Sequence, residues 1–406
     1  MDGSNQPPRI RVLMFTNLFP NPQDTTHGIF SLQLARELAK ICDLTVVCPL
    51  PWFPRWSILR HFPKWYAFAK IPRQYQIYGM QVYSPKYMML PKLSGAIQGA
   101  MVFFGTFSTV WRMHRAKHFD VINSLWLYPD GVASAWISKL LKVPMLPSAR
   151  GCDVNRMLNE ADKRGQILAM LRRAPTIFSV SDALRDSMVA HGIPASRITI
   201  IPNGVNTDLF FIRDRAAARA ELGLPIDRQT IVYVGRLSEE KGLPTLIGAA
   251  ARLRDRGRDF LLCLIGDGPL FLRLKALIDE LDLGESVLLA GRQEHCVVAT
   301  WFGACDVFCL PSLREGCPNV VLEALSSGRP VVGSRVGGIP EMVTADTGIL
   351  VEPEDVPGLA NALDEALTRK WDESRVAASM QGNTWRAAAK KYHDTYLRAI
   401  GGTGTN

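Results

Sequence analysis

The sequence lacks the patterns that identify disulfide scaffolds and metal sites. Eight cysteines in 406 residues are too few for a disulfide framework, and neither they nor the seven histidines follow a zinc-ligand spacing. There is also no G-x-S-x-G motif, no P-loop and no H-E-x-x-H motif, which argues against the hydrolases, NTPases and zinc proteases that these patterns identify. Because the cysteines form no disulfide framework, we expect a protein of a reducing, cytosolic compartment.

Long hydrophobic runs are missing as well. The N-terminal stretch MDGSNQPPRIRV has no apolar core of the signal-peptide type. The most apolar window, residues 96–111, is shorter than the roughly 20 residues that span a bilayer. We predict that this window forms a buried or interfacial helix rather than a transmembrane one.

Acidic residues are scarce in the first half of the chain. Residues 1–197 hold 24 Lys and Arg against 11 Asp and Glu, a balance of +13, although the whole chain carries only +9. No acid occurs between Asp43 and Asp120, where ten Lys or Arg lie. This asymmetry favours an anionic partner for the N-terminal half, such as a membrane surface, an acidic acceptor or nucleic acid.

The positive features of the sequence begin with two series of short apolar runs. Each run is followed by a loop and a helical pattern, which predicts parallel sheets covered by helices on both faces. The predicted strands of the first series lie at 9–19, 44–50, 120–124, 144–148, 176–180 and 198–202. Those of the second series lie at 230–237, 259–269, 287–292, 306–312 and 330–336. We expect an α/β protein with two Rossmann-like domains facing each other across a cleft.

The predicted domain boundary lies in the hinge-like stretch after Asn203-Gly204. The first domain then covers residues 1–205 and the second covers residues 206–383. A helical, mixed-charge segment at 384–400 is expected to return to the first domain.

One segment, residues 51–78, interrupts the first series. It carries nine aromatic residues and five Lys or Arg without one acid. Aromatic rings suit the lipid headgroup zone and basic side chains suit an anionic leaflet, which predicts a membrane-contacting insertion. The alternative is a proline-broken loop whose aromatics pack on the domain. Proteins that bind nucleic acid also combine basic and aromatic residues, but no nucleic-acid-binding motif accompanies this segment.

Charged and glycine-rich clusters follow the predicted strands of the second series. Arg236 and Lys241 share one loop and suit a diphosphate that gains charge as it leaves. The other clusters are tight turns where backbone can approach a ligand. These predicted donor-binding positions are Gly235, Gly266, Gly268 and Arg292. Taken alone, the Arg236–Lys241 cluster is better explained as solvated loop charges, and each of the other clusters is a weak signal. Together, at the carboxyl ends of neighbouring strands, they indicate a ligand site.

The stretch from Cys309 to Glu341 gives the strongest local signal. A strand ends at Pro311, a loop carries Glu315, and a helical pattern opens after Pro318 and contains Glu323. A helix N-terminus after a glycine-bearing loop is an anion site. Two carboxylates beside it predict a ligand that is phosphate on one side and polyhydroxyl on the other, as in a nucleotide sugar. The alternative is a capped loop with Glu323 exposed to solvent.

The first half offers fewer candidates. Arg150 and Asp153 follow a predicted strand and could hold an anionic acceptor and a hydroxyl, although a structural Arg–Asp pair is the alternative. Gly28 precedes a helix and could let a phosphate approach its start.

These motifs resemble the retaining glycosyltransferases of family 4, which have the GT-B fold. The resemblance covers nearly the whole chain. It rests on the Gly28 loop, the Glu315-to-Glu323 spacing and five stretches of sequence. These stretches are SVSDALRDSM (179–188), IIPNGVNTDLF (200–210), YVGRLSEEKG (233–242), LIGDGP (264–269) and GGIPEMV (337–343). The N-terminal LFPNP…GIF pattern is similar to bacterial cell-surface polysaccharide enzymes of the teichuronic-acid type.

The resemblance implies roles for the residues. Glu315 would contact the donor sugar and Glu323 the ribose, while Arg236 and Lys241 would hold the diphosphate. The distal phosphate would meet the backbone around Gly316, Pro318 and Asn319, and Gly28 from the other domain. No metal is implied, because two cations and a helix end can replace magnesium. Where many members carry His-Gly, this chain has Arg150-Gly151, so the acceptor side departs from the family pattern.

The expected function is a hexosyltransferase that moves a sugar from a nucleoside diphosphate to a lipid-linked or polysaccharide acceptor. The enzyme would work at the inner face of the cytoplasmic membrane, in peripheral contact with anionic lipid and without nucleic acid. Two alternatives remain, namely a nucleotide-sugar epimerase and a catalytically silent binding protein of the same fold.

Overall fold

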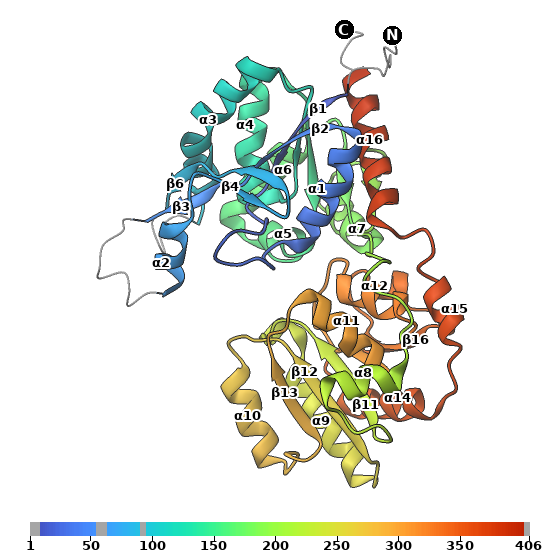
Figure 1. Ribbon diagram of the computed structural model, residues 1–406. Coiled ribbons are helices and arrows are strands. Elements are labelled where there is room, and N and C mark those ends of the chain that lie inside the picture. Colours follow the sequence, from blue (N-terminus) through green and yellow to red (C-terminus); the bar gives the residue numbers. More distant parts are fainter. Residues whose placement is uncertain (1–8, 54–62, 90–94, 402–406) are drawn as a thin grey trace, which may run out of the picture. The chain divides into compact units, whose positions relative to one another are not determined.

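The computed structural model describes residues 9–53, 63–89 and 95–401. The chain forms two compact units (Figure 1). The N-terminal unit comprises Met1–Pro202 together with Trp385–Asn406, and the C-terminal unit comprises Asn203–Thr384. The chain thus passes from the N-terminal to the C-terminal unit three residues before the predicted boundary. The C-terminal helix belongs to the N-terminal unit.

An eight-stranded sheet forms the centre of the N-terminal unit. Its spatial order is β10 (Ile198–Ile200), β9 (Ile177–Ser179), β8 (Met145–Ala149), β7 (Val121–Ser124), β1 (Arg11–Phe15), β2 (Asp43–Val47), β5 (Met80–Tyr83) and β4 (Gln74–Ile77). All neighbours are parallel except β4 and β5. The six predicted strands of the first series are present. The β4–β5 hairpin was not predicted, because β4 lies inside the segment at 51–78 that interrupts the apolar pattern and β5 follows directly after it.

Helices cover this sheet. They are α1 (Ile29–Ile41), α2 (Pro63–Lys70), α3 (Gln98–Lys117), α4 (Val132–Leu141), α5 (Cys152–Asn155), α6 (Ala161–Leu171), α7 (Asp182–Ala190) and α16 (Trp385–Gly401). In Figure 1, α16 runs beside α1. Its Tyr392 ring lies 4.3 Å from that of Phe178, and the Tyr396 hydroxyl donates to Asn123 Oδ1 at 3.0 Å. The end of the chain therefore completes the core of the N-terminal unit.

The segment at 51–78 is described only in part, because residues 54–62 lie outside the described residues. Strand β3 (Leu50–Trp52) pairs with β6 (Lys86–Met88). Phe53 and Tyr75 are buried, and the Tyr75 hydroxyl donates to the Pro20 carbonyl at 3.0 Å. Trp52 and Tyr78 are exposed. The described aromatics thus divide between packing on the unit and facing solvent.

The C-terminal unit contains a six-stranded, wholly parallel sheet. Its order is β13 (Val287–Gly291), β12 (Phe260–Ile265), β11 (Gln229–Val234), β14 (Val307–Leu310), β15 (Val331–Ser334) and β16 (Gly348–Val351). Counted within the unit this is 3-2-1-4-5-6, the Rossmann order, in which ligands bind beyond the carboxyl ends of the strands at the point of reversal. That point lies between β11 and β14.

Eight helices of the described C-terminal unit connect and flank these strands. They are α8 (Arg215–Leu222), α9 (Leu243–Asp255), α10 (Phe271–Glu280), α11 (His295–Ala304), α12 (Asn319–Ser326), α13 (Ile339–Met342), α14 (Val356–Thr368) and α15 (Glu373–Ala378). The strands β11, β12, β14 and β15 are almost entirely buried. This explains their short, continuously apolar sequences. Strand β16, with the short apolar sequence GILV at the edge of the sheet, was not predicted.

Candidate active site

The loops after β11, β12 and β13 pack backbone against backbone. A Cβ on Gly266 would lie 1.8 Å from the Gly235 carbonyl oxygen, and a Cβ on Gly268 would lie 2.3 Å from that of Leu237. The Leu237 amide also donates to the Asp267 carbonyl at 3.0 Å. Only glycine fits such an approach. The predicted glycines thus join three strand-end loops into one layer, with Arg236 exposed at its surface.

A cation and a carboxylate meet at the reversal point of the sheet. Lys241, after β11, lies with its Nζ 2.6 Å from Glu315 Oε1, after β14. The Ser312 hydroxyl donates to the same Glu315 oxygen at 2.6 Å. A Cβ on Gly242 would lie 2.0 Å from the Pro311 carbonyl oxygen, so the two loops are held in close contact. Two residues predicted to be catalytic are therefore brought together.

The N-terminus of α12 lies directly beyond this pair. Pro318 is its N-cap and offers no side-chain hydrogen bond to the first turn, which holds no acid. The first N–H groups of a helix lack intrahelical partners, so they can bind an anion. The Asn203 amide Nδ2 donates to Asn319 Oδ1 at 2.7 Å and to the Cys317 carbonyl at 3.2 Å. The loop around Gly316 is held by the Gly338 amide, which donates to the Gly316 carbonyl at 2.8 Å.

Glu323 is buried, at 7% exposure, and the alternative of a solvent-exposed Glu323 is wrong. Its Oε1 lies 2.9 Å from Nε2 of His295, the first residue of α11. Burial lowers the pKa of His295, but the hydrogen bond and charge of Glu323 outweigh it, so the net pKa is raised. The Phe210 ring packs 5.0 Å from the imidazole.

Sequence reasoning missed His295, because its partner lies 28 residues further along the chain. The available signal was its position just after the Gly291-Arg292 strand end. This is the edge of the sheet at which the other candidates gather. Arg292 itself is exposed.

The predicted acceptor residues lie in the N-terminal unit and are largely enclosed. Asp153 is fully buried, and its carboxylate accepts the backbone amides of Arg150, Gly151 and Leu127. It therefore holds backbone in this structure and exposes no oxygen to a hydroxyl. The predicted alternative of a structural Arg–Asp pair is present through the main chain of Arg150, whose amide donates to the Asp153 carboxylate at 3.0 Å. The Arg150 guanidinium stands over the Phe30 ring and donates to the Tyr392 hydroxyl at 3.4 Å.

Gly28 adopts a left-handed conformation at the N-cap of α1, with φ 64°. A Cβ there would lie 2.3 Å from the Leu18 carbonyl carbon and oxygen. The space that a side chain at this position would need is occupied by the Leu18 backbone. Packing alone therefore explains a glycine here, in addition to the predicted contact with phosphate.

A second buried acid, Asp130, was not singled out from the sequence. Its Oδ2 accepts the Asn17 amide at 2.7 Å, and its Oδ1 has no hydrogen-bond partner among the described residues. Burial raises the pKa of Asp130 to about 7. Within the described chain no cluster of His, Cys, Asp and Glu has the arrangement of a metal site.

Comparison with known families covers both units. Residues 28–209 match the family described as Glycosyltransferase Family 4, and residues 214–385 match Glycosyl transferases group 1. The chain belongs to the glycosyltransferases that combine these two family domains.

Curated relatives agree with this membership. The chain is 29% identical over 369 residues, 89% of each protein, to TuaC of Bacillus subtilis (strain 168), which bears the name of a teichuronic acid biosynthesis glycosyltransferase. It is 31% identical over 257 residues to D-inositol 3-phosphate glycosyltransferase of Mycobacterium tuberculosis (strain F11). That alignment spans 62% of this chain and about half, 48%, of the relative.

Solved structures establish the GT-B fold of the glycosyltransferase. Sucrose-phosphate synthase of Thermosynechococcus elongatus matches with a TM-score of 0.76 at 21% identity, over 97% of this chain and all of that one. Anabaena Alr3699/HepE in complex with UDP-glucose matches with a TM-score of 0.65 at 20% identity, over 97% and 99% of the two chains.

Proposed function

We propose that this glycosyltransferase moves a hexosyl group, with retention of configuration, from a nucleoside-diphosphate sugar to a lipid-linked or polysaccharide acceptor of the cell surface. The observation that carries the proposal is the Lys241–Glu315 pair at the reversal point of the Rossmann-type sheet, next to the uncapped start of α12. Membership in the family and the name of the TuaC relative support the polysaccharide role.

The donor would be held by complementary charge. Lys241, Arg236 and the first N–H groups of α12 offer positive charge to the diphosphate. Glu315 offers carboxylate oxygens to sugar hydroxyls, and Glu323, fixed by His295, offers them to the ribose. This set fits a reaction without a metal, because the cations and the helix end can neutralise the leaving diphosphate.

The chemical step is a displacement at the anomeric carbon of the donor. The bond from this carbon to the diphosphate oxygen breaks with its electron pair on the diphosphate. The acceptor oxygen bonds to the same face, and its proton passes to the departing phosphate oxygen. Lys241 and Arg236 stabilise the charge that develops, and Glu315 positions the sugar. The acceptor would be presented at the inner surface of the cytoplasmic membrane.

The test is the Glu315→Gln variant. It removes the carboxylate charge and leaves an amide of the same size beside Ser312. We expect turnover to fall by at least about 100-fold, as for loss of an aligned polar group in an active site. The circular dichroism spectrum should be unchanged. Glu280→Gln, at an exposed position of α10, is the matched control.

Turnover of Glu315→Gln within a few fold of the natural chain would reject the assignment. Product formed without any acceptor would instead indicate the epimerase.

A further inference from the structure

Helix α3 is apolar on two opposite faces. Its buried stripe consists of Gly99, Val102, Thr106 and Val110. On the other side Phe104 is 78% exposed and Trp111, two turns later, is 40% exposed. Large apolar side chains that are exposed together on one face of a helix mark a surface that binds protein or lipid. Here one of the two apolar faces has no protein cover in the described chain.

The exposed apolar surface continues onto α4, which packs against α3 in Figure 1. The Phe103 ring on α3 lies 5.7 Å from the Trp136 ring on α4 in an edge-on contact. Trp136 is 37% exposed and Leu140, one turn further, is 57% exposed. Two helices thus present one group of large apolar side chains, which we call the α3–α4 face.

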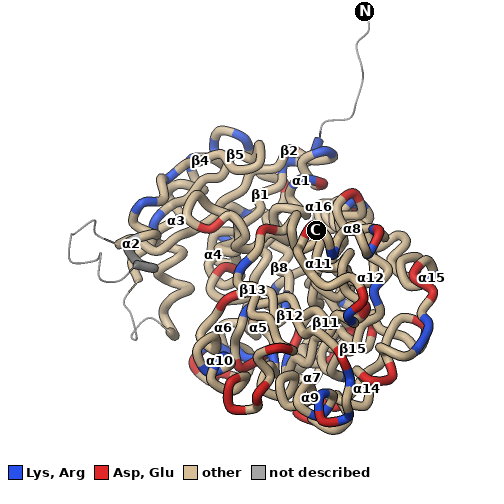
Figure 2. The backbone as a smooth tube through the Cα atoms, turned by 60° about the horizontal axis from the view of Figure 1, so that its bottom comes forward, with Lys and Arg blue, Asp and Glu red and all other residues tan. Residues whose placement is uncertain are grey.

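Every charge on these two helices is positive. Neither α3 nor α4 contains Asp or Glu, and Arg112, Arg115 and Lys139 are exposed beside the aromatic residues. Arg115 lies over the Trp111 ring at 5.1 Å. Figure 2 marks Lys and Arg in blue and Asp and Glu in red along the backbone. Basic side chains around exposed aromatics form the pattern of an interfacial helix on anionic lipid.

A groove adjoins this face. It has a volume of about 760 Å³ and lies between α4 and α6. Its walls include Trp136, Met145 and Met170, and Lys139 and Arg173 lie among its lining residues. No acid is among those lining residues. An apolar channel with cations at its border suits the acyl chain and phosphate of a lipid.

We propose that the α3–α4 face is the surface by which this glycosyltransferase docks on an anionic lipid bilayer. Phe104, Trp111 and Leu140 enter the headgroup and acyl boundary, while Arg112, Arg115 and Lys139 pair with lipid phosphates. The inference rests on the proposed function for the presence of a membrane acceptor, but it assigns the contact to residues outside the segment at 51–78.

A second copy of the chain is a weaker occupant of this face. A two-fold interface would place the same surface on both subunits, so each cluster of Arg112, Arg115 and Lys139 would meet its own copy. Like charges at such short range oppose association, whereas lipid phosphates neutralise them.

The experiment is flotation of the full chain with vesicles. Vesicles of phosphatidylcholine alone are compared with vesicles that contain 30% phosphatidylglycerol, at low and at high salt. One variant combines Phe104→Ser, Trp111→Ser and Leu140→Ser, and the other combines Arg112→Glu, Arg115→Glu and Lys139→Glu. The matched control combines Leu272→Ser, a residue that is 77% exposed, with Lys275→Glu, both on α10 of the C-terminal unit.

We expect the natural chain and the control to float at least tenfold better with the anionic vesicles, and both surface variants to lose that advantage. High salt should weaken binding, because it screens the lipid charge. Transfer to a water-soluble acceptor should stay unchanged in both surface variants. Glu315→Gln should float normally without turnover, so failure of the docking proposal and failure of the proposed function are separable.

Three results would overturn the proposal. The first is that the surface variants float as well as the natural chain, and the second is that the natural chain binds neutral and anionic vesicles equally. The third is that sedimentation detects a dimer which the Phe104→Ser, Trp111→Ser and Leu140→Ser variant dissociates, while this variant still floats.

Discussion

At the scale of single residues, the contact between His295 and Glu323 makes the site sensitive to pH. A protonated imidazole donates a charge-assisted hydrogen bond to the buried carboxylate. Because the folded pKa of His295 is raised above its ordinary value of 6.5, this contact stabilises the fold fully below 6.5. The contribution is lost as the pH rises through the raised pKa.

We predict that His295→Gln is less stable than the natural chain by about 1.5 to 3 kcal/mol at pH 6, since hydrogen bonds to charged groups contribute that much. The difference should shrink toward pH 9. Urea unfolding across that range measures it, and His191→Gln, on a histidine at the end of α7, is the control. A difference that does not vary with pH would contradict the assigned ionisation.

The same residue should also act on donor binding. If His295 positions Glu323 for the ribose, His295→Ala should raise the donor KM about tenfold and change kcat much less, and His295→Gln should recover most of the loss. Nucleoside diphosphate binding, followed by calorimetry, gives the same comparison without turnover. Equal losses in kcat for both variants would point to a general structural role instead.

The sequence placed Lys241 and Glu315 at neighbouring strand ends, and the structure brings their side chains into contact, while their roles in the reaction stay a prediction. What the sequence could not supply was burial. Asp153 looked suited to bind a hydroxyl, but its place behind the end of β8 gives it backbone amides as partners. Whether a carboxylate meets ligand or main chain depends on tertiary packing that local patterns do not contain.

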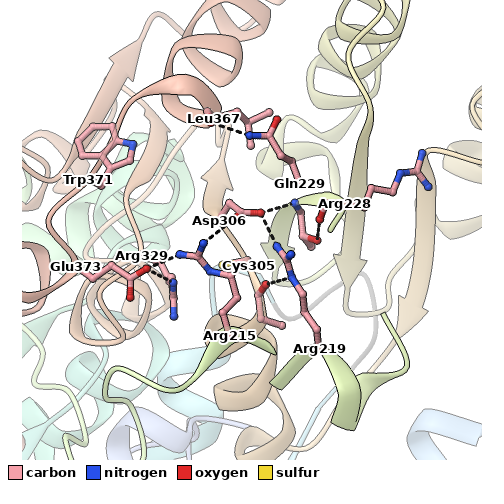
Figure 3. A network of polar contacts seen from close by, with 12 residues as sticks. Arg215, Arg219, Arg228, Gln229, Cys305, Asp306, Arg329, Leu367, Trp371 and Glu373 are labelled. Carbon is pink, nitrogen blue, oxygen red and sulfur yellow. Dashed lines mark hydrogen bonds and ion pairs between the residues drawn. The ribbon is translucent and has the colours of Figure 1, made fainter. Parts of the chain in front are cut away.

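At the scale of elements, a cluster of charges joins the amino ends of β11 and β14 to α8 and α15 (Figure 3). Asp306, just before β14, pairs with Arg215 at 2.8 Å and Arg219 at 2.6 Å. Glu373, the first residue of α15, pairs with Arg215 and with the fully buried Arg329 at 2.8 Å. The cluster lies at the opposite edge of the sheet from the Lys241–Glu315 pair, so its role is to hold the C-terminal unit together.

The cluster predicts an asymmetry between two substitutions. Glu373→Gln removes the counter-ion of a buried guanidinium whose pKa burial already lowers, and should cost about 3 kcal/mol of unfolding free energy. Arg329→Met leaves Glu373 paired with Arg215 and fills a similar volume, so it should cost less. Chemical unfolding of both variants measures the two losses of stability, and the donor KM of each variant is the second readout. An unaltered KM with the reverse order of stability would contradict the account.

Strands with a continuous apolar run that are buried on both faces were predictable, whereas two strands at the edges of the sheets were missed. The strands β11, β12 and β14 are buried on both faces and therefore have continuous apolar sequences. The edge strand β4 is partly exposed and has the mixed sequence QYQI, whereas β16, at the edge of the other sheet, has the short apolar sequence GILV with two half-buried residues. Their pairing depends on the neighbouring strand rather than on their own composition.

At the scale of the whole molecule, the N-terminal unit is built from two separate parts of the chain. Helix α16 returns after the complete C-terminal unit and buries Trp385, Tyr392 and Tyr396. Loss of one large buried aromatic side chain costs about 3 to 5 kcal/mol, so loss of three approaches or exceeds the roughly 5 to 15 kcal/mol that stabilises a domain. The C-terminal unit contains its whole sheet within Asn203–Thr384 and needs no such return.

Truncation after residue 384 should therefore unfold one unit and spare the other. Limited proteolysis should cut the truncated chain throughout residues 9–202 and leave 203–384 protected, and nucleoside diphosphate should still raise the melting temperature of that fragment in proportion to its binding. Truncation after residue 401 keeps α16 and is the control. The milder substitution Tyr396→Phe removes only the hydrogen bond to Asn123 and should lower the free energy of unfolding by about 1 kcal/mol. Unchanged protection of residues 9–202 without α16 would show that the sheet of the N-terminal unit and its first seven helices suffice. The buried contacts of Tyr392 and Tyr396 would then contribute far less than their enclosure implies.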